Sequence, residues 1–191
     1  MQSTIQDLLP LLERIAIAQE RIAIAQERIA QIGGSEGFFN YGKKVYANLT
    51  KGNGDGWYVL KDDIAETQPS ICRGWLVGIS FPKMERRRQE VRKFHLVMNV
   101  AGETVTFESG YDCFFSKTIL ATFAIASPEV LARPIQLATY PKKLRTSDQT
   151  LAVSLRDSNG NKLPSEWSND DDWSAIATAA IANVKAAVSS R

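Results

Sequence analysis

Two strand-length apolar segments, with a strongly basic segment between them, constrain the fold of this chain more than any other feature. Residues 74–81 and 93–100 are rich in aromatic and β-branched side chains, as buried β-strands are. From residue 83 to residue 93 the sequence carries six basic and two acidic side chains, a local net charge of +4. Because a hairpin turn needs only about two to five residues, we predict that this segment is a long basic loop on a β-scaffold. We call residues 83–93 the basic finger; its cations are Lys83, Arg86, Arg87, Arg88, Arg92 and Lys93.

The charge of the whole chain is distributed unevenly around this finger. The formal net charge of +2 divides into −1 over residues 1–34, +5 over residues 35–156 and −2 over residues 157–191. With 191 residues, of which 44% are hydrophobic, the chain is long enough for one well-packed domain and an appendage. A basic middle between acidic ends favours a polyanionic partner.

The two cysteines and the apolar runs exclude several classes of protein. Cys72 and Cys113 have no second Cys or His at metal-ligand spacing, which argues against zinc ribbons and disulfide frameworks. No uncharged apolar run reaches the roughly 18 residues of a membrane-spanning helix. We therefore expect a cytoplasmic protein with reduced thiols, no metal, no cofactor and no membrane partner.

A seven-residue repeat dominates residues 5–32. The sequence ERIAIAQ occupies residues 13–19, recurs at 20–26 and continues in part at 27–32. This period predicts a coiled coil that joins copies of the chain. Ile17 and Ile24 make a second apolar side, which favours a bundle of three or more helices or packing on the globular domain; a solvated amphipathic helix is the alternative. The predicted seam consists of Leu8, Leu11, Ile15, Ala18, Ile22, Ala25, Ile29 and Ile32.

The rest of the chain divides into three further regions. Residues 35–72 read as an aromatic and glycine-rich connecting segment with one short strand, and residues 169–191 as a C-terminal helix whose start Asp170–Asp172 cap. Residues 73–168 read as a β-domain. Its expected strands are 74–81, 93–100, 103–109, 135–140 and 151–155, with a helix at 117–126 and a hairpin turn at Asn159-Gly160.

Three strands, a helix and two more strands follow the element order of the OB-fold, a five-stranded barrel. In this order alone, and without a diagnostic motif, residues 73–167 resemble that fold. The predicted fold class is therefore α+β: an N-terminal coiled-coil helix, a mainly antiparallel, OB-fold-like β-β-β-α-β-β barrel, and a C-terminal helix. An SH3-like barrel and a small α+β sheet are the alternatives.

A second basic group indicates what such a barrel would bind. Lys142, Lys143 and Arg145 lie between the last two expected strands. In an OB-fold, that loop and the loop carrying the basic finger flank the nucleic-acid groove. We predict a non-enzymatic, oligomeric protein that binds single-stranded DNA or RNA, with Trp75 and Phe107 stacking on bases. Basic loops that only maintain solubility are the simpler alternative.

Two other functions remain open at this point. The coiled coil suits a structural or adaptor protein of a phage- or plasmid-type assembly, in which the β-domain binds another protein. An enzyme is the third hypothesis. His95 and Cys113 are the available nucleophile pair, but the apolar neighbours of each favour a structural role.

Overall fold

The computed structural model describes residues 42–49, 56–86, 88–143 and 149–191. Residues 1–41 lie outside this set, so the predicted coiled coil and all eight residues of its seam lie outside the described structure. Arg87 and Arg145 also lie outside it. For Arg86, only the backbone is described.

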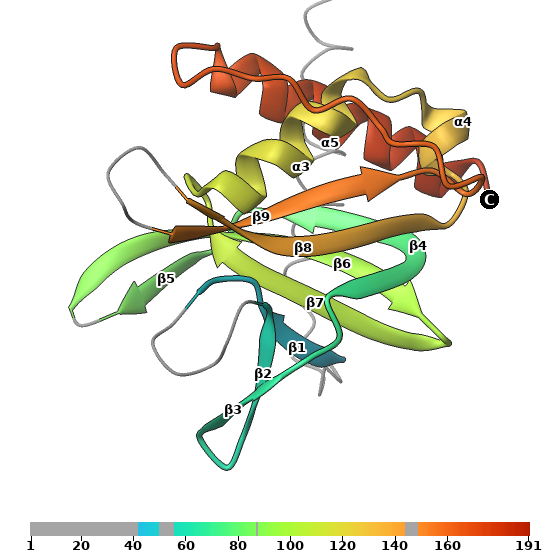
Figure 1. Cartoon of the computed structure of the whole chain (residues 1–191). Coiled ribbons are helices and arrows are strands. Elements are labelled where there is room, and N and C mark those ends of the chain that lie inside the picture. Colours follow the sequence, from blue (N-terminus) through green and yellow to red (C-terminus); the bar gives the residue numbers. More distant parts are fainter. Residues whose placement is uncertain (1–41, 50–55, 87, 144–148) are drawn as a thin grey trace, which may run out of the picture. The chain divides into compact units, whose positions relative to one another are not determined.

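The described residues form a nine-stranded sheet and three helices (Figure 1). The strand order is β3-β2-β1-β7-β6-β4-β8-β9, and β5 pairs with β6 alone. Neighbouring strands run antiparallel except for β1 and β7, which are parallel. The strands are β1 (Lys43–Tyr46), β2 (Tyr58–Lys61), β3 (Ile64–Thr67), β4 (Ile71–Ser80), β5 (Lys83–Arg86), β6 (Gln89–Val100), β7 (Glu103–Gly110), β8 (Ile135–Lys143) and β9 (Gln149–Arg156).

The helices α3 (Phe114–Ile125), α4 (Pro128–Leu131) and α5 (Trp173–Ser189) gather on one side of the sheet (Figure 1). The Asp172 side chain accepts hydrogen bonds from the backbone amides of Ser174 and Ala175, so the predicted C-terminal helix and its acidic cap are confirmed. Asn183 joins α5 to the end of α3, because its amide donates to three backbone carbonyls there. The two longer helices therefore form one layer.

The sheet is open, and the prediction of a closed barrel is wrong. The described part of residues 35–72 contains three complete strands rather than the one expected, and β1 pairs with the edge of β7. This pairing extends the sheet through β2 to β3 instead of closing it. The expected strand after the Asn159-Gly160 turn is reduced to a single bridge between Arg156 and Lys162.

Strand β4 belongs to both halves of the sheet. Its residues Ile71–Gly74 pair with β8, and Trp75–Ser80 pair with β6. At the change of partner the backbones approach so closely that a Cβ atom on Gly74 would lie 2.4 Å from the carbonyl oxygen of Asn99. Only glycine fits this position without displacing a strand.

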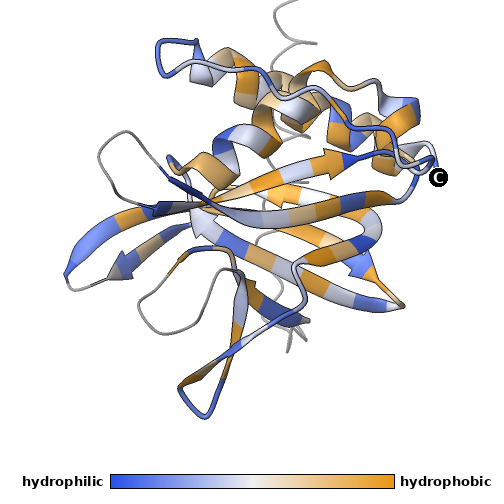
Figure 2. Cartoon of the chain, in the orientation of Figure 1, coloured by the Kyte–Doolittle hydropathy of each residue, from blue (hydrophilic) through white to orange (hydrophobic). Residues whose placement is uncertain are grey.

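The hydrophobic core lies on one face of β6 and β7. Phe94, Leu96 and Met98 alternate along β6 with Lys93, His95 and Val97, and only the first set is fully buried. Figure 2 shows hydrophobic and hydrophilic residues interleaved along the strands of the sheet. Residues paired across strands share a face, so the two faces of this sheet carry different chemistry.

Candidate nucleic-acid interface

The basic finger is a β-hairpin rather than the loop that the sequence predicts. Strands β5 and β6 pair from Lys83 with Arg92 to Arg86 with Gln89. The sequence that connects the two strands lacks the Asn-Gly or Asp-Gly signal of a tight hairpin. Arg88 takes the left-handed conformation there, with φ of 63°. The finger is therefore an arm of the sheet.

The pairing distributes the charges of the finger over both of its faces. Lys83 and Arg92 are opposite each other and lie on the face that continues the core side of β6. Lys93 lies on the other face. The Lys83 ammonium also pairs with the Glu90 carboxylate at 2.9 Å, and both side chains are exposed. The face of the finger that carries Lys83 and Arg92 is thus not uniformly cationic.

On the helix side, the two predicted basic groups both contact aromatic rings at the start of α3. The Arg92 guanidinium lies 6.0 Å from the ring centre of Tyr111, which is 49% exposed. The Lys142 ammonium, from the end of β8, lies 4.1 Å from the ring centre of Phe114. Two segments that are distant in sequence therefore converge on one short stretch of chain.

Two tryptophans extend this set of rings. Phe114 packs against Trp167 with ring centres 4.9 Å apart, and Trp167 meets Trp173 edge-on at 5.5 Å. Lys117 lies 5.8 Å from the first indole and 5.1 Å from the second. We call this set the cation–aromatic surface; it consists of Arg92, Tyr111, Phe114, Lys117, Lys142, Trp167 and Trp173.

A cleft of about 410 Å³ opens between the root of the finger and the first turns of α5. Arg92 and Tyr111 line one part of it, and Trp173 and Thr178 line another. The Lys117 ammonium also lines the cleft and is held 2.5 Å from the Asp112 carboxylate. Cations, ring faces and a concave space therefore occur together at this end of the domain.

The two aromatic residues predicted to stack on bases lie elsewhere. Phe107 is a core residue, 2% exposed, packed against Trp57 with ring centres 4.9 Å apart. Trp75 is 43% exposed, but it lies near the start of the β4–β6 pairing, whereas the finger follows the end of β4. The Arg191 guanidinium lies 5.1 Å from its ring. Sequence reasoning instead missed Tyr111, Trp167 and Trp173, whose cationic partners Arg92 and Lys117 are distant in the chain.

Of the remaining predicted residues, Lys143 is exposed at the end of β8, next to Lys142. Tyr140, two residues earlier in the strand, is also exposed. The second basic group therefore has an exposed ring of its own nearby.

The opposite face of the sheet holds a buried carboxylate, Glu108. One of its oxygens, Oε2, accepts from the Lys44 ammonium at 2.6 Å and contacts His95 Nε2 at 2.9 Å. Burial alone would raise the pKa of Glu108, but the hydrogen bonds from His95 and Lys44, and their charges, lower it to about 2. The carboxylate is therefore ionised at neutral pH.

The two cysteines are free, and neither meets the histidine. His95 Nε2 is engaged by Glu108, while Cys113 Sγ lies 3.6 Å from Ser116 Oγ at the start of α3. Burial raises the pKa of the Cys72 thiol to about 11, which disfavours its reactive thiolate. Within the described ranges, no group of three His, Cys, Asp or Glu side chains could hold a metal ion.

No helix among the residues that the structure describes is long and apolar enough to cross a membrane. Comparison of the chain with protein-family models, with curated proteins and with solved structures finds no match.

Proposed function

We propose that this chain is a non-enzymatic, cytoplasmic protein that binds single-stranded DNA or RNA along the cation–aromatic surface. The observation that supports this most is the convergence of the two basic segments: Arg92 and Lys142 contact rings that are three residues apart, Tyr111 and Phe114. A single strand needs cations for its phosphates and ring faces for its bases, and proteins that bind it combine the two in a groove.

The exposed rings suit a single strand better than a duplex. Bases of a duplex are stacked on one another, whereas those of a single strand are free to stack on Tyr111 and Tyr140, both nearly half exposed. Apart from the β5 arm and the short helix α4, the order of strands and helix after residue 73 is that of the OB-fold, which binds nucleic acid between the equivalent loops. The sheet here is open, so the proposal concerns the location of the surface and not a barrel.

The heptad repeat at residues 5–32 completes the proposal. A coiled coil there would join several cation–aromatic surfaces in one particle. Once one surface holds a strand, the others meet the same strand at a high effective concentration. Self-association would thus raise the avidity for long strands without any new contact.

The test is fluorescence anisotropy with labelled single- and double-stranded oligonucleotides at two salt concentrations. The single strand should bind more tightly, and a variant with Arg92→Ala and Lys142→Ala should flatten the slope of log affinity against log salt by about 1.4, or about 0.7 for each lost phosphate contact. The matched control is Lys162→Ala with Lys185→Ala, which removes the same charge from exposed positions outside the surface. Absence of single-strand binding at low salt would refute the proposal.

One observation favours the adaptor function as a second candidate. The β2–β3 hairpin carries exposed apolar side chains, including Leu60 and Ile64, the latter 68% exposed. Strand β3 is also an edge of the sheet. Exposed apolar groups on an edge strand favour contact with another protein. If oligonucleotides do not bind, a protein partner for this hairpin becomes the leading hypothesis.

A further inference from the structure

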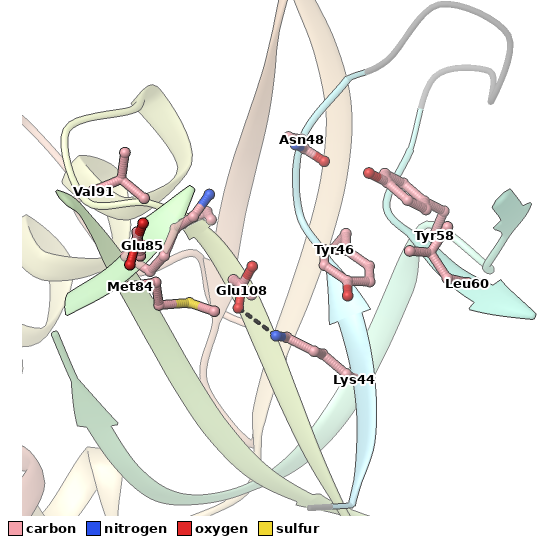
Figure 3. Close-up of a pocket in the computed structure, with 11 residues that line it drawn as sticks. Lys44, Tyr46, Asn48, Tyr58, Leu60, Met84, Glu85, Val91 and Glu108 are labelled. Carbon is pink, nitrogen blue, oxygen red and sulfur yellow. Dashed lines mark ion pairs between the residues drawn. The ribbon is translucent and has the colours of Figure 1, made fainter. Parts of the chain in front are cut away.

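A second cavity, of about 280 Å³, lies on the other face of the basic finger (Figure 3). Met84 and Lys93 of the finger line it, together with Tyr46, Tyr58 and Glu108 of the neighbouring strands. Its volume is close to the lower end of the range for small-molecule sites, about 300–1,000 Å³. A space of this size accommodates a single planar ring system.

The walls of the cavity suit a flat, partly polar group. Tyr46 and Tyr58 are cross-strand partners whose rings are stacked, with centres 5.3 Å apart and planes 21° from parallel. In Figure 3 these rings lie on one side of Glu108, and Met84 lies on the other. The Lys44 ammonium also lines this space and lies 5.3 Å from the centre of the Tyr46 ring. A ring that enters the cavity therefore meets aromatic side chains, an ammonium group and a polarisable thioether, and the rings and the thioether are favourable neighbours of a nucleobase.

The carboxylate of Glu108 has one oxygen available in this cavity. Both of its contacts, from Lys44 and from His95, are made to Oε2. Figure 3 shows the second carboxylate oxygen, Oε1, directed away from Lys44. Since Glu108 is only 6% exposed, its acceptor oxygen is fixed in place before any ligand arrives.

We propose that this cavity takes one base of the bound strand and selects a base with an exocyclic amino group over uracil or thymine. The inference rests on the proposed function. The amino group of cytosine, adenine or guanine donates to Glu108 Oε1, as carboxylates accept from cytosine N4 in base recognition. Uracil carries a carbonyl oxygen on C4, where cytosine carries its amino group, and the carboxylate repels that oxygen. Lys93, at the root of the finger, supplies a cation for the adjoining phosphate.

The experiment compares oligo(dC) with oligo(dU) of equal length by anisotropy competition. These bases have the same ring size, and C4 carries an amino group in one and a carbonyl oxygen in the other. We expect about tenfold tighter binding of oligo(dC), the effect of one hydrogen bond to a charged acceptor. Glu108→Gln should abolish or reverse this preference, because the glutamine amide can donate to uracil O4.

A second variant tests the cavity without changing Glu108, whose replacement leaves Lys44 and His95 without their partner. Leu60 lines the rim of the cavity and is exposed, so Leu60→Trp fills the space from outside. Ile64→Trp, on the same hairpin but not lining the cavity, is the matched control. Leu60→Trp should remove the preference for oligo(dC) and leave the salt slope unchanged, whereas Ile64→Trp should change neither.

The outcomes separate this inference from the proposed function. Equal binding of oligo(dC) and oligo(dU) by the unmodified chain would overturn the inference and leave the function intact. A preference that survives Leu60→Trp would also overturn it. Absence of binding by either oligonucleotide would overturn both.

Discussion

The two faces of the basic finger place similar groups in opposite environments. On the helix side, the Lys83–Glu90 ion pair is exposed at both ends, and the Lys117–Asp112 pair is exposed at its carboxylate. On the other face, Lys44 and His95 meet at Glu108, whose side chain is almost completely buried. Exposed ion pairs contribute little to stability, whereas loss of one partner of a buried pair is costly. The comparison therefore separates side chains available to a ligand from side chains that hold the sheet together.

The largest effect on stability is expected from Glu108→Leu. The change leaves Lys44 without a counter-charge and His95 without its hydrogen-bond partner, and it weakens the contact between β1 and β7. We expect a loss of about 3 kcal/mol in the free energy of unfolding, measured by chemical denaturation. Glu90→Leu, which removes the exposed carboxylate of the finger, should change it by less than about 0.5 kcal/mol. Equal effects of the two substitutions would contradict the comparison.

A smaller effect is expected from acid. The pKa of Glu108 lies at about 2 in the folded protein, below the ordinary value of 4.5. Its contribution to stability is therefore fully present above about pH 4.5 and is lost as the pH falls toward 2. The stability difference between the unmodified chain and Glu108→Gln should shrink by about 2–3 kcal/mol over this window. If the difference does not change with pH, then Lys44 and His95 do not lower the pKa of Glu108.

The smallest effect on stability is expected from the finger itself. Replacement of Arg86, Arg87, Arg88 and Arg92 by Ala should change the free energy of unfolding by less than about 0.5 kcal/mol for each residue. The slope of log affinity against log salt should nevertheless flatten by as much as about 3, since four phosphate contacts are lost. Thermal unfolding and anisotropy on the same samples measure both quantities. A large fall in melting temperature would show that these arginines stabilise the hairpin.

The long apolar runs made much of the fold predictable. The strands expected at 74–81 and 93–100 correspond to β4 and β6, and the C-terminal helix expected within residues 169–191 corresponds to α5. The prediction of a closed barrel was wrong because the parallel pairing of β1 with β7 joins segments about 60 residues apart. No local pattern encodes that choice of partner. The prediction of a loop in the finger was wrong for another reason. Arg88, which has a left-handed backbone, is not one of the residues that usually mark such a position in a turn.

The candidate site was predictable in its charges but not in its rings. Basic residues such as Arg92 and Lys142 are visible in the sequence as clusters, whereas their aromatic partners follow from the packing of α3 and α5. Glu108 was overlooked beside Phe107, although a charged residue inside an apolar strand is itself a signal. Such a residue needs a partner on an adjacent strand, and His95 was the natural candidate.

The shared strand β4 fixes the positions of the two basic segments relative to each other. Because one strand pairs with both β6 and β8, and a side chain on Gly74 would force them apart, the arm that carries Arg92 and the hairpin that carries Lys142 belong to one rigid unit. A flexible polymer that touches both would have to conform to a spacing set in advance by the protein. The ordering cost of association would then fall mainly on the ligand. A nucleic-acid strand too short to span the two arms would contact only one of them.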